Sequence, residues 1–288
     1  MRLLLGYKAN HLSEIRLPAF VSVKYDGWRA LWQGVEFFTR NAKTLPNRAV
    51  RSLAALHQVP AGWDGEVIVG GPCDAKTFDR TNRFCKTLAA PIPSVGVRFF
   101  VFDNALAGGG FLDRYSTVFA IPPFVEVVHQ ELIERYDELE AFEAKAVADG
   151  YEGICARALQ GRYKQGRSTA REQYLVKLKR YIDDEVTILS AEPRLHNANP
   201  AFVSETGYTK RSSHRDGKVP LNTLGTLITD WRNQTLRVGS GWDHAEAARL
   251  WAMFLAGTLQ GQRATVRFSP PTKDLPRQPI YKGLRHDL

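Results

Sequence analysis

Cysteine is scarce in this chain of 288 residues, and the three that occur, Cys73, Cys85 and Cys155, have no paired spacing and no nearby set of histidines. This pattern indicates neither a disulfide framework nor a zinc site, and it favours a reducing compartment. No hydrophobic run approaches membrane-spanning length, and the segment from Met1 to Lys8 lacks the long apolar stretch and cleavage site of a signal peptide. We therefore expect a protein that is cytoplasmic and is neither secreted nor bound to a membrane.

Internal repeats and low-complexity tracts are also absent. What the chain does have is positive charge, with 39 Lys and Arg against 30 Asp and Glu and a formal net charge of +9. This balance favours a polyanionic partner such as nucleic acid, although a merely basic soluble protein would have the same composition. With 44% hydrophobic residues, the chain is long enough for one large domain or two modest ones.

The pattern of elements changes near residue 182. Before it, strand-like runs at 30–32, 36–39, 66–69 and 97–102 mix with helical segments around 49–57 and 139–149, and the glycines at 108–110 read as a loop. After it come strand-like runs at 185–190, 225–229, 234–238 and 264–268, with one helix that Asp243 can cap. Several strands with one helix suit a small oligonucleotide-binding (OB) barrel. We predict an α+β chain with domains at 1–182 and 183–288.

The most informative segment is Lys24-Tyr25-Asp26-Gly27-Trp28-Arg29, which follows an apolar run at 19–23 that is typical of a buried strand. A lysine amine at the end of a strand can attack a phosphorus atom, a neighbouring acid can position it, and the glycine lets the backbone approach a ligand. The arginine can bind phosphate or ribose oxygens. The alternative interpretation is a strand followed by an Asp-Gly turn with two solvated charges.

Two carboxylates and two aromatic rings stand at comparable positions further along the chain. Glu66 begins one strand-like run and Glu152 begins another, so each could bind a ribose hydroxyl or a metal ion. Phe100 and Phe102 lie on one side of an aromatic strand, and one ring could stack on a nucleobase. A phenylalanine in a strand is nevertheless more often part of the core.

Lys177 and Lys179 alternate along a strand and therefore share one face. Two ammonium groups on one face are unfavourable unless an anion lies between them, and phosphate is the obvious one. The alternative is an ordinary exposed strand.

Taken in order, the segments KYDGWR, DGEV, FFVFD, YEGI and LVKLK resemble the nucleotidyltransferase motifs of ATP-dependent DNA ligases, RNA ligases and mRNA capping enzymes. The short segment at 39–41 resembles a further small motif of these enzymes. A basic segment at 204–218, the segment at 163–169 and the tail at 276–287 are similar to the minimal two-domain DNA ligases of the Chlorella virus type. The resemblance covers about residues 20–288.

This resemblance implies a nucleotidyltransferase domain of antiparallel sheets and helices, followed by an OB-fold domain with a DNA-binding latch hairpin at about 203–222. It implies ATP as the AMP donor, Mg²⁺ (or Mn²⁺ in its place) as the metal, and nicked double-stranded DNA as the substrate of a monomer of phage or viral type. Lys24 would form lysyl-AMP, AMP would pass to the 5′-phosphate of the nick, and the 3′-hydroxyl would seal the strand. Lys177, Lys179 and the metal would favour the neutral form of the Lys24 amine.

The resemblance also assigns roles residue by residue, with Lys24 as the catalytic nucleophile. The nucleotide would be bound by Arg29, Glu66, Phe102, Glu152, Lys177, Lys179, Arg277, Arg285 and Asp287. DNA would be bound by Arg40, Arg167, Ser168, Thr169, Lys210, Arg211, Arg215 and Lys218. The metal would be bound, through waters, by Asp26, Glu66 and Glu152.

Two other classes of function stay open. An RNA ligase or a GTP-using capping enzyme shares the motifs, but the latch-like segment and the tail disfavour both. A non-catalytic nucleic-acid-binding scaffold would also suit the charge and the barrel. The lysines and carboxylates of the motifs disfavour it, because binding alone does not require them together. NAD⁺ is not expected as the AMP donor, because little chain precedes Lys24.

Overall fold

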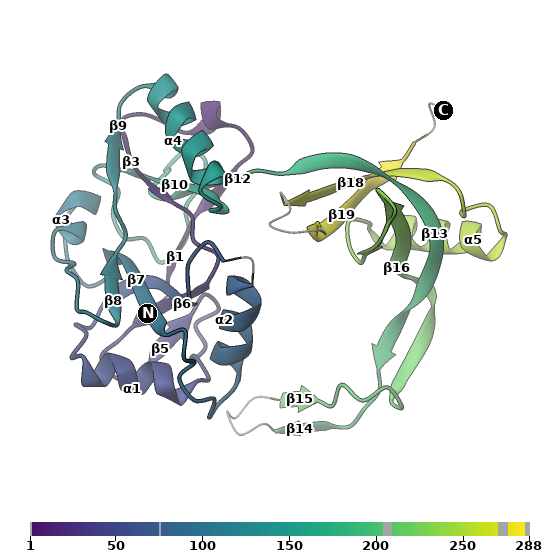
Figure 1. Cartoon of the computed structure of the whole chain (residues 1–288), viewed down its shortest axis with the longest axis horizontal. Coiled ribbons are helices and arrows are strands. Elements are labelled where there is room, and N and C mark those ends of the chain that lie inside the picture. Colours follow the sequence, from purple (N-terminus) through teal and green to yellow (C-terminus); the bar gives the residue numbers. More distant parts are fainter. Residues whose placement is uncertain (1, 75, 204–208, 270–275, 286–288) are drawn as a thin grey trace. The chain divides into compact units, whose positions relative to one another are not determined.

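The computed structural model describes residues 2–74, 76–203, 209–269 and 276–285 (Figure 1). The chain divides into two compact units, Met1–Lys179 and Arg180–Leu288. This division lies a few residues before the expected one at residue 182, and strand β13 (Ile182–Asn197) belongs wholly to the second unit. Among the described residues, no helix is long and apolar enough to cross a membrane.

The first unit contains two five-stranded sheets (Figure 1). One has the order β2-β12-β10-β3-β9, in which β2 runs parallel to β12 and the other neighbours are antiparallel. Alternate residues on its strands, including Val21, Ile154 and Leu178, pack against Leu139 and Ala146 of helix α4. The elements are β2 (Tyr7–Ala9), β12 (Val176–Lys179), β10 (Gly153–Ala158), β3 (Ala19–Val23), β9 (Glu131–Ile133) and α4 (Tyr136–Ala148).

Because side chains alternate along a strand, the opposite face of this sheet carries a second set of residues. Lys177 pairs with Cys155 of β10, which in turn pairs with Ser22 of β3, and on the other side Lys177 pairs with Lys8 of β2. We call this surface the polar face of the sheet.

The other sheet has the order β5-β4-β6-β7-β8, antiparallel except for β7 and β8. One of its faces, with Val67, Phe99 and Val101, packs against helices α1 and α2. Its other face carries Glu66, Ile68, Phe100 and Phe102. The elements are β5 (Phe37–Thr39), β4 (Trp28–Trp32), β6 (Trp63–Val69), β7 (Val97–Asn104), β8 (Val125–Val127), α1 (Arg48–Leu56) and α2 (Thr77–Lys86).

Short elements complete the first unit. Strand β1 (Leu4–Leu5) pairs with β11 (Gly166–Arg167), and a 3₁₀ helix spans Leu12–Glu14. Helix α3 (Phe111–Tyr115) begins directly after the glycines at 108–110, which form the loop that the sequence predicted.

The second unit is a five-stranded antiparallel sheet, in the order β17-β16-β13-β18-β19, that packs against helix α5. The helix begins where expected, because the Asp243 carboxylate accepts a hydrogen bond from the Glu246 N–H at 2.8 Å. Beyond β13, the chain forms a small hairpin, β14 (Ala201–Val203) and β15 (Thr209–Arg211), before it returns in β16 (Figure 1). The remaining elements are β16 (Lys218–Trp231), β17 (Gln234–Val238), α5 (His244–Leu255), β18 (Arg263–Ser269) and β19 (Arg277–Leu284).

Most of the expected strands and all three expected helices are confirmed within a few residues. Helix α2 was missed, because its sequence is largely polar and its N-cap residue, Lys76, has no side-chain capping bond. The packing of Phe84 and Cys85 against the core residues of the sheet stabilises a helix that the local sequence does not predict.

Candidate active site

Lys24 continues the ladder between β3 and β10 beyond the end of β3. Its backbone N–H donates to the carbonyl of Gly153 at 2.8 Å, and its carbonyl accepts from the N–H of Glu152 at 3.2 Å. This pairing places the two side chains together, and the Lys24 ammonium forms an ion pair with the Glu152 carboxylate. Lys179 donates to the other oxygen of the same carboxylate. Glu152 therefore joins two of the predicted lysines.

Gly153 has a positive φ of 145° and lies opposite Lys179 of β12. A Cβ atom there would lie 2.2 Å from the carbonyl oxygen of Leu178. Only glycine fits this position, so the Glu-Gly pair of the YEGI segment serves two purposes. The acid contacts Lys24, and the glycine lets the neighbouring strand come close.

Burial and the neighbouring groups act on the pKa of Lys24 in opposite directions. Burial by itself would lower the pKa of the ammonium, but the neighbouring groups, chiefly the carboxylate of Glu152, outweigh burial and raise it. These neighbours favour the charged ammonium. The neutral amine expected from Lys177, Lys179 and a bound metal stays a prediction.

Glu66 lies opposite Arg29 across β4 and β6 and opposite Phe100 across β6 and β7. Among the described residues, its carboxylate has neither a hydrogen-bond nor an ion-pair partner. Burial raises its pKa to about 7, with Glu152 and Asp64 adding to the shift and the cations Lys24 and Arg29 opposing it. Glu66 therefore titrates near neutral pH, and its carboxylate can accept a hydrogen bond from a ligand hydroxyl.

Replacing Glu66 by Gln is expected to stabilise the protein at high pH and to change little at low pH. Because the pKa of Glu66 is about 7 in the folded protein and near 4.5 in the unfolded chain, the stability tied to its protonated form is lost as the pH rises through 7. At pH 8.5 the variant should gain on the order of 2 kcal/mol in the free energy of unfolding. Thermal denaturation at pH 4.5 and 8.5 measures this, with the exposed Glu140→Gln as control. An equal gain at both pH values would contradict it.

Lys177 lies among cations. Burial lowers the pKa of its ammonium, and the charges of Lys24, Arg40 and Arg167 lower it further. Within the described parts of the chain, no carboxylate pairs with it. Several cations that face one place without a counter-ion favour the binding of an anion such as phosphate. We call Lys177, Arg40 and Arg167, which lie beside Lys24, the cationic cluster.

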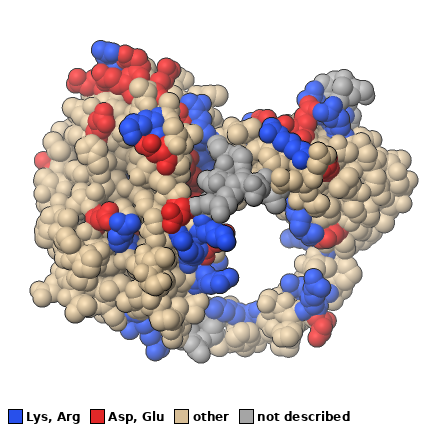
Figure 2. Space-filling view, viewed as in Figure 1, with Lys and Arg blue, Asp and Glu red and all other residues tan. Residues whose placement is uncertain are grey.

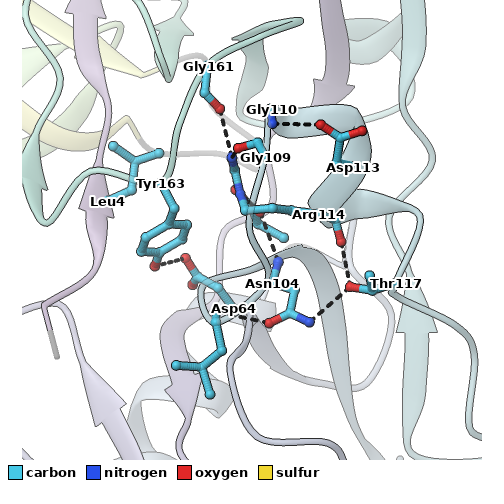
Figure 3. Close-up of polar contacts among 12 residues, drawn as sticks. Leu4, Asp64, Asn104, Gly109, Gly110, Asp113, Arg114, Thr117, Gly161 and Tyr163 are labelled. Atoms are coloured by element: carbon cyan, nitrogen blue, oxygen red, sulfur yellow. Dashed lines mark hydrogen bonds and ion pairs between the residues drawn. The ribbon is translucent and has the colours of Figure 1, made fainter.

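Arg29 is held in one orientation by a buried carboxylate. Its Nε and Nη2 each donate to an oxygen of Asp64 at 2.6 Å, and Nη2 also donates to the carbonyl of Leu4 at 3.1 Å. The hydroxyl of Tyr163 donates to the same carboxylate at 2.6 Å (Figure 3). The guanidinium is therefore positioned before any ligand arrives.

Arg114 forms a second buried ion pair, with Asp103 at the end of β7. Its Nε and Nη2 donate to the two carboxylate oxygens at 2.9 and 3.2 Å, and Nη1 donates to the carbonyls of Gly161 and Gly109 at 2.8 and 3.1 Å. Figure 3 shows the Arg114 side chain extending toward Gly109 and Gly161. Arg114 thus ties the loop before α3 to the segment that carries Tyr163.

The two candidate stacking rings, Phe100 and Phe102, are both buried in a small cluster with Ile68 and Val128. The guanidinium carbon of Arg29 lies 4.6 Å from the centre of the Phe102 ring. Phe102 therefore lies beside an arginine of the KYDGWR segment, whereas Phe100 packs against Tyr25 at 4.7 Å. Stacking of Phe102 on a base stays a prediction.

Comparison with known proteins places these features in a family. Residues 8–179 match the family model described as the ATP dependent DNA ligase domain, which is more than half of the chain. The chain belongs to this family. It is also similar to a DNA ligase of Haloarcula marismortui, with 29% identity over 170 residues. That match covers 52% of this chain and 30% of the archaeal protein, so the chain spans less than a third of that relative's length.

Solved structures of DNA ligases share the fold of this ligase-family chain. A Chlorella virus DNA ligase-adenylate has 22% identity and a TM-score of 0.54, with 99% of each chain covered. A Lig E DNA ligase has 23% identity and a TM-score of 0.68, with 98% of each chain covered. The predicted α+β fold, a nucleotidyltransferase domain followed by an OB-fold domain with a hairpin, is confirmed.

Of the DNA-binding residues expected in the nucleotidyltransferase domain, three reach the surface. Arg40 and Arg167 are exposed, and Nη1 of Arg167 donates to the carbonyl of Gly6 at 2.9 Å. Thr169 is also exposed, and its hydroxyl shares hydrogen bonds with Glu172. Ser168 is fully buried, so this structure does not present its side chain to DNA.

The hairpin of the OB-fold domain carries the other expected DNA contacts. Lys210, Arg211 and Arg215 are exposed and Lys218 is half-buried, and Figure 2 shows basic side chains along this hairpin. The amide of buried Asn199 holds the base of the hairpin together through bonds to the carbonyls at positions 212 and 214. Acidic side chains gather instead over α4, at the upper left of Figure 2.

The tail residues are described only in part. Arg285 pairs with Glu185, a carboxylate that also pairs with Arg263. The side chain of Arg277 and the whole of Asp287 lie outside the described residues. Their expected contact with pyrophosphate stays a prediction.

The expected metal ligands do not form a compact group. No cluster of three or more His, Cys, Asp or Glu side chains suited to a metal occurs in the described ranges. Glu66 and Glu152 are close enough for the charge of Glu152 to raise the pKa of Glu66, whereas Asp26 lies in the loop between β3 and β4. Two carboxylates fit a Mg²⁺ ion that keeps most of its waters.

Sequence reasoning missed the buried polar residues behind the site. Asp64, Asp103 and Tyr163 lie within or next to segments that resemble ligase motifs. Only the structure shows that the two buried aspartates bind Arg29 and Arg114, and that Tyr163 donates to Asp64. Arg114 carried no sequence signal, and Arg157, at the end of the YEGI strand, was passed over.

Proposed function

We propose that this protein is an ATP-dependent DNA ligase that seals nicks in duplex DNA. The observation that supports this most directly is the contact between Lys24 and Glu152 beside a cationic cluster that lacks a counter-ion. A non-catalytic scaffold would not require a half-buried lysine to contact a carboxylate beside a group of cations. The family and the fold are those of DNA ligases.

In the first step, the Lys24 amine attacks the α-phosphorus of ATP. An N–P bond forms, the bond to pyrophosphate breaks, and one proton leaves the ammonium. Because the pKa of Lys24 is raised, this proton must be removed before attack, and Glu152 is the carboxylate in contact with Nζ that can accept it. Lys177, Arg40 and Arg167 stabilise the negative charge on the phosphate.

Arg29 and Glu66 lie side by side across β4 and β6 and are suited to the ribose. Arg29 is fixed by Asp64 and so can bind a ribose oxygen without reorganisation, and Glu66 can accept from a ribose hydroxyl. When bound, Mg²⁺ would supply further positive charge at the phosphates, held through waters by Glu66 and Glu152. AMP then passes to the 5′-phosphate of the nick, and attack by the 3′-hydroxyl releases it.

Incubation with α-³²P-ATP, α-³²P-GTP or adenylate-labelled NAD⁺, each with Mg²⁺ and followed by a denaturing gel, tests the proposal. We expect a labelled protein band from ATP alone, which nicked duplex DNA removes. Label from GTP would indicate capping chemistry, and label removed only by nicked RNA would indicate an RNA ligase. If none of the three nucleotides labels the protein, the remaining interpretation is a non-catalytic nucleic-acid-binding scaffold.

The hairpin of the OB-fold domain should serve the DNA step and not the nucleotide step. Replacing Lys210 and Arg215 by Ala removes two exposed charges, so the slope of log binding constant against log salt for nicked DNA should fall by about 2. Nick sealing at 150 mM salt should fall by about tenfold or more, while formation of lysyl-AMP stays unchanged. The control replaces Arg135, which directly precedes α4, and Lys145, which lies on α4, by Ala. Equal losses in both steps would contradict this role.

A further inference from the structure

Arg157 is a buried cation that lacks hydrogen-bond partners. It lies on β10 with 2% of its surface exposed, and its Nε and Nη1 donate to none of the residues that the structure describes. A buried guanidinium is costly unless it is paired and hydrogen-bonded. Because such groups are rare in native structures, an explanation is required for these two N–H groups.

The nearby carboxylates are bound to other arginines and do not accept from Arg157. Both oxygens of Asp103 accept from Arg114, and both oxygens of Asp64 accept from Arg29. In this buried cluster, the three arginines 29, 114 and 157 outnumber the two aspartates 64 and 103. Asp103 compensates part of the charge at a distance, although burial still lowers the pKa of Arg157.

The position of Arg157 relates it to the nucleotide site. Alternation along β10 places it with Gly153 and Cys155, on the polar face of the sheet and away from the core under α4. Its guanidinium carbon lies 4.8 Å from the centre of the Phe102 ring. The guanidinium of Arg29 contacts the same ring at 4.6 Å. Arg157 therefore borders the ring that we expect to stack on a base.

We propose that Arg157 is a nucleobase-binding residue whose two unpaired N–H groups donate to ring nitrogens of the purine that lies against Phe102. This inference rests on the proposed function, because it takes the ligand of the site to be ATP. A purine presents N1, N3 and N7 as acceptors, and a guanidinium can donate to such atoms in a fixed geometry. The stacking of Arg157 on Phe102 keeps the guanidinium near the ring until the base arrives.

Purine analogues that lack one acceptor test the proposal in the wild-type protein. The concentration for half-maximal labelling of Lys24 is measured with ATP, 1-deaza-ATP, 3-deaza-ATP and 7-deaza-ATP. At least one analogue should require about tenfold more nucleotide, since a lost hydrogen bond to a charged group is worth about that factor. In Arg157→Met, the half-maximal concentration for ATP should rise similarly, and the penalty for that analogue should disappear.

The control variant is Arg162→Met, an exposed arginine that packs against Tyr174 at 5.7 Å and should leave all four values unchanged. If Arg157→Met does not fold, Arg157→Lys keeps the charge without the fork and should reduce the penalty. Analogues that all behave as ATP, or a penalty that persists in the Arg157 variants, would overturn the proposal. Failure of the ligase function itself would differ, because ATP would then not label the wild-type protein.

Discussion

Lys24→Ala is expected to abolish formation of the protein–AMP intermediate while leaving the last step of sealing intact. In the proposed first step the Lys24 amine bonds to AMP, so labelling with α-³²P-ATP should fall by about 10³-fold or more. The third step joins the 3′-hydroxyl to a phosphate that is already adenylated, and no bond to Lys24 is made or broken there. The variant should therefore still seal a nick that carries a pre-formed 5′-adenylate, as measured on a sequencing gel.

The pre-adenylated nick also controls for folding, since a misfolded variant would fail in both assays. Lys145→Ala is the matched control, because Lys145 is an exposed lysine that pairs with Asp149 on α4. It should leave labelling and sealing unchanged. Loss of all activity in a folded Lys24→Ala protein would mean that Lys24 also serves the DNA steps. Normal labelling would place the nucleophile elsewhere.

Arg114→Met is expected to destabilise the protein more than any surface substitution. Only 1% of the Arg114 side chain is exposed, and its removal leaves the buried Asp103 carboxylate without its bidentate partner. The carbonyls of Gly109 and Gly161 also lose their donor. Breaking a buried pair by removing one partner costs about 3–5 kcal/mol, which urea denaturation measures as a lower free energy of unfolding.

Two further variants distinguish the loss of the Arg114–Asp103 ion pair from the loss of an arginine side chain as such. Arg135→Met removes an arginine whose ion pair with Asp137 is exposed, and it should change stability little. Arg114→Met combined with Asp103→Asn removes the stranded charge and should recover part of the loss. A small effect of Arg114→Met alone would show that water or another cation reaches Asp103.

Much of the site could be predicted from the chain because its parts lie at strand ends. An apolar run at 19–23 predicts a strand, and Lys24 follows it directly, so the position of the nucleophile needed no tertiary information. Alternation along a strand likewise predicts the face of the sheet on which Lys177 or Phe102 lies. Helix α5 was predictable because Asp243 caps it locally.

Other features depend on contacts between distant parts of the chain. Helix α2 is held by packing, and Ser168 is buried because its N–H bonds to the carbonyl of Leu5 at 2.7 Å. The raised pKa of Lys24 arises from Glu152, which lies 128 residues away in the sequence. A local pattern carries no signal for such a pairing.

The sequence by itself indicated the family, the order of the two domains and the candidate residues for the chemistry. These depend on residue type and short spacing, which the chain displays directly. Only the tertiary structure decided which charges meet, that the neighbours of Lys24 raise its pKa, and that Arg157 is buried with unpaired donors. Charge pairing and desolvation depend on distances in space, and residues far apart in the chain set those distances.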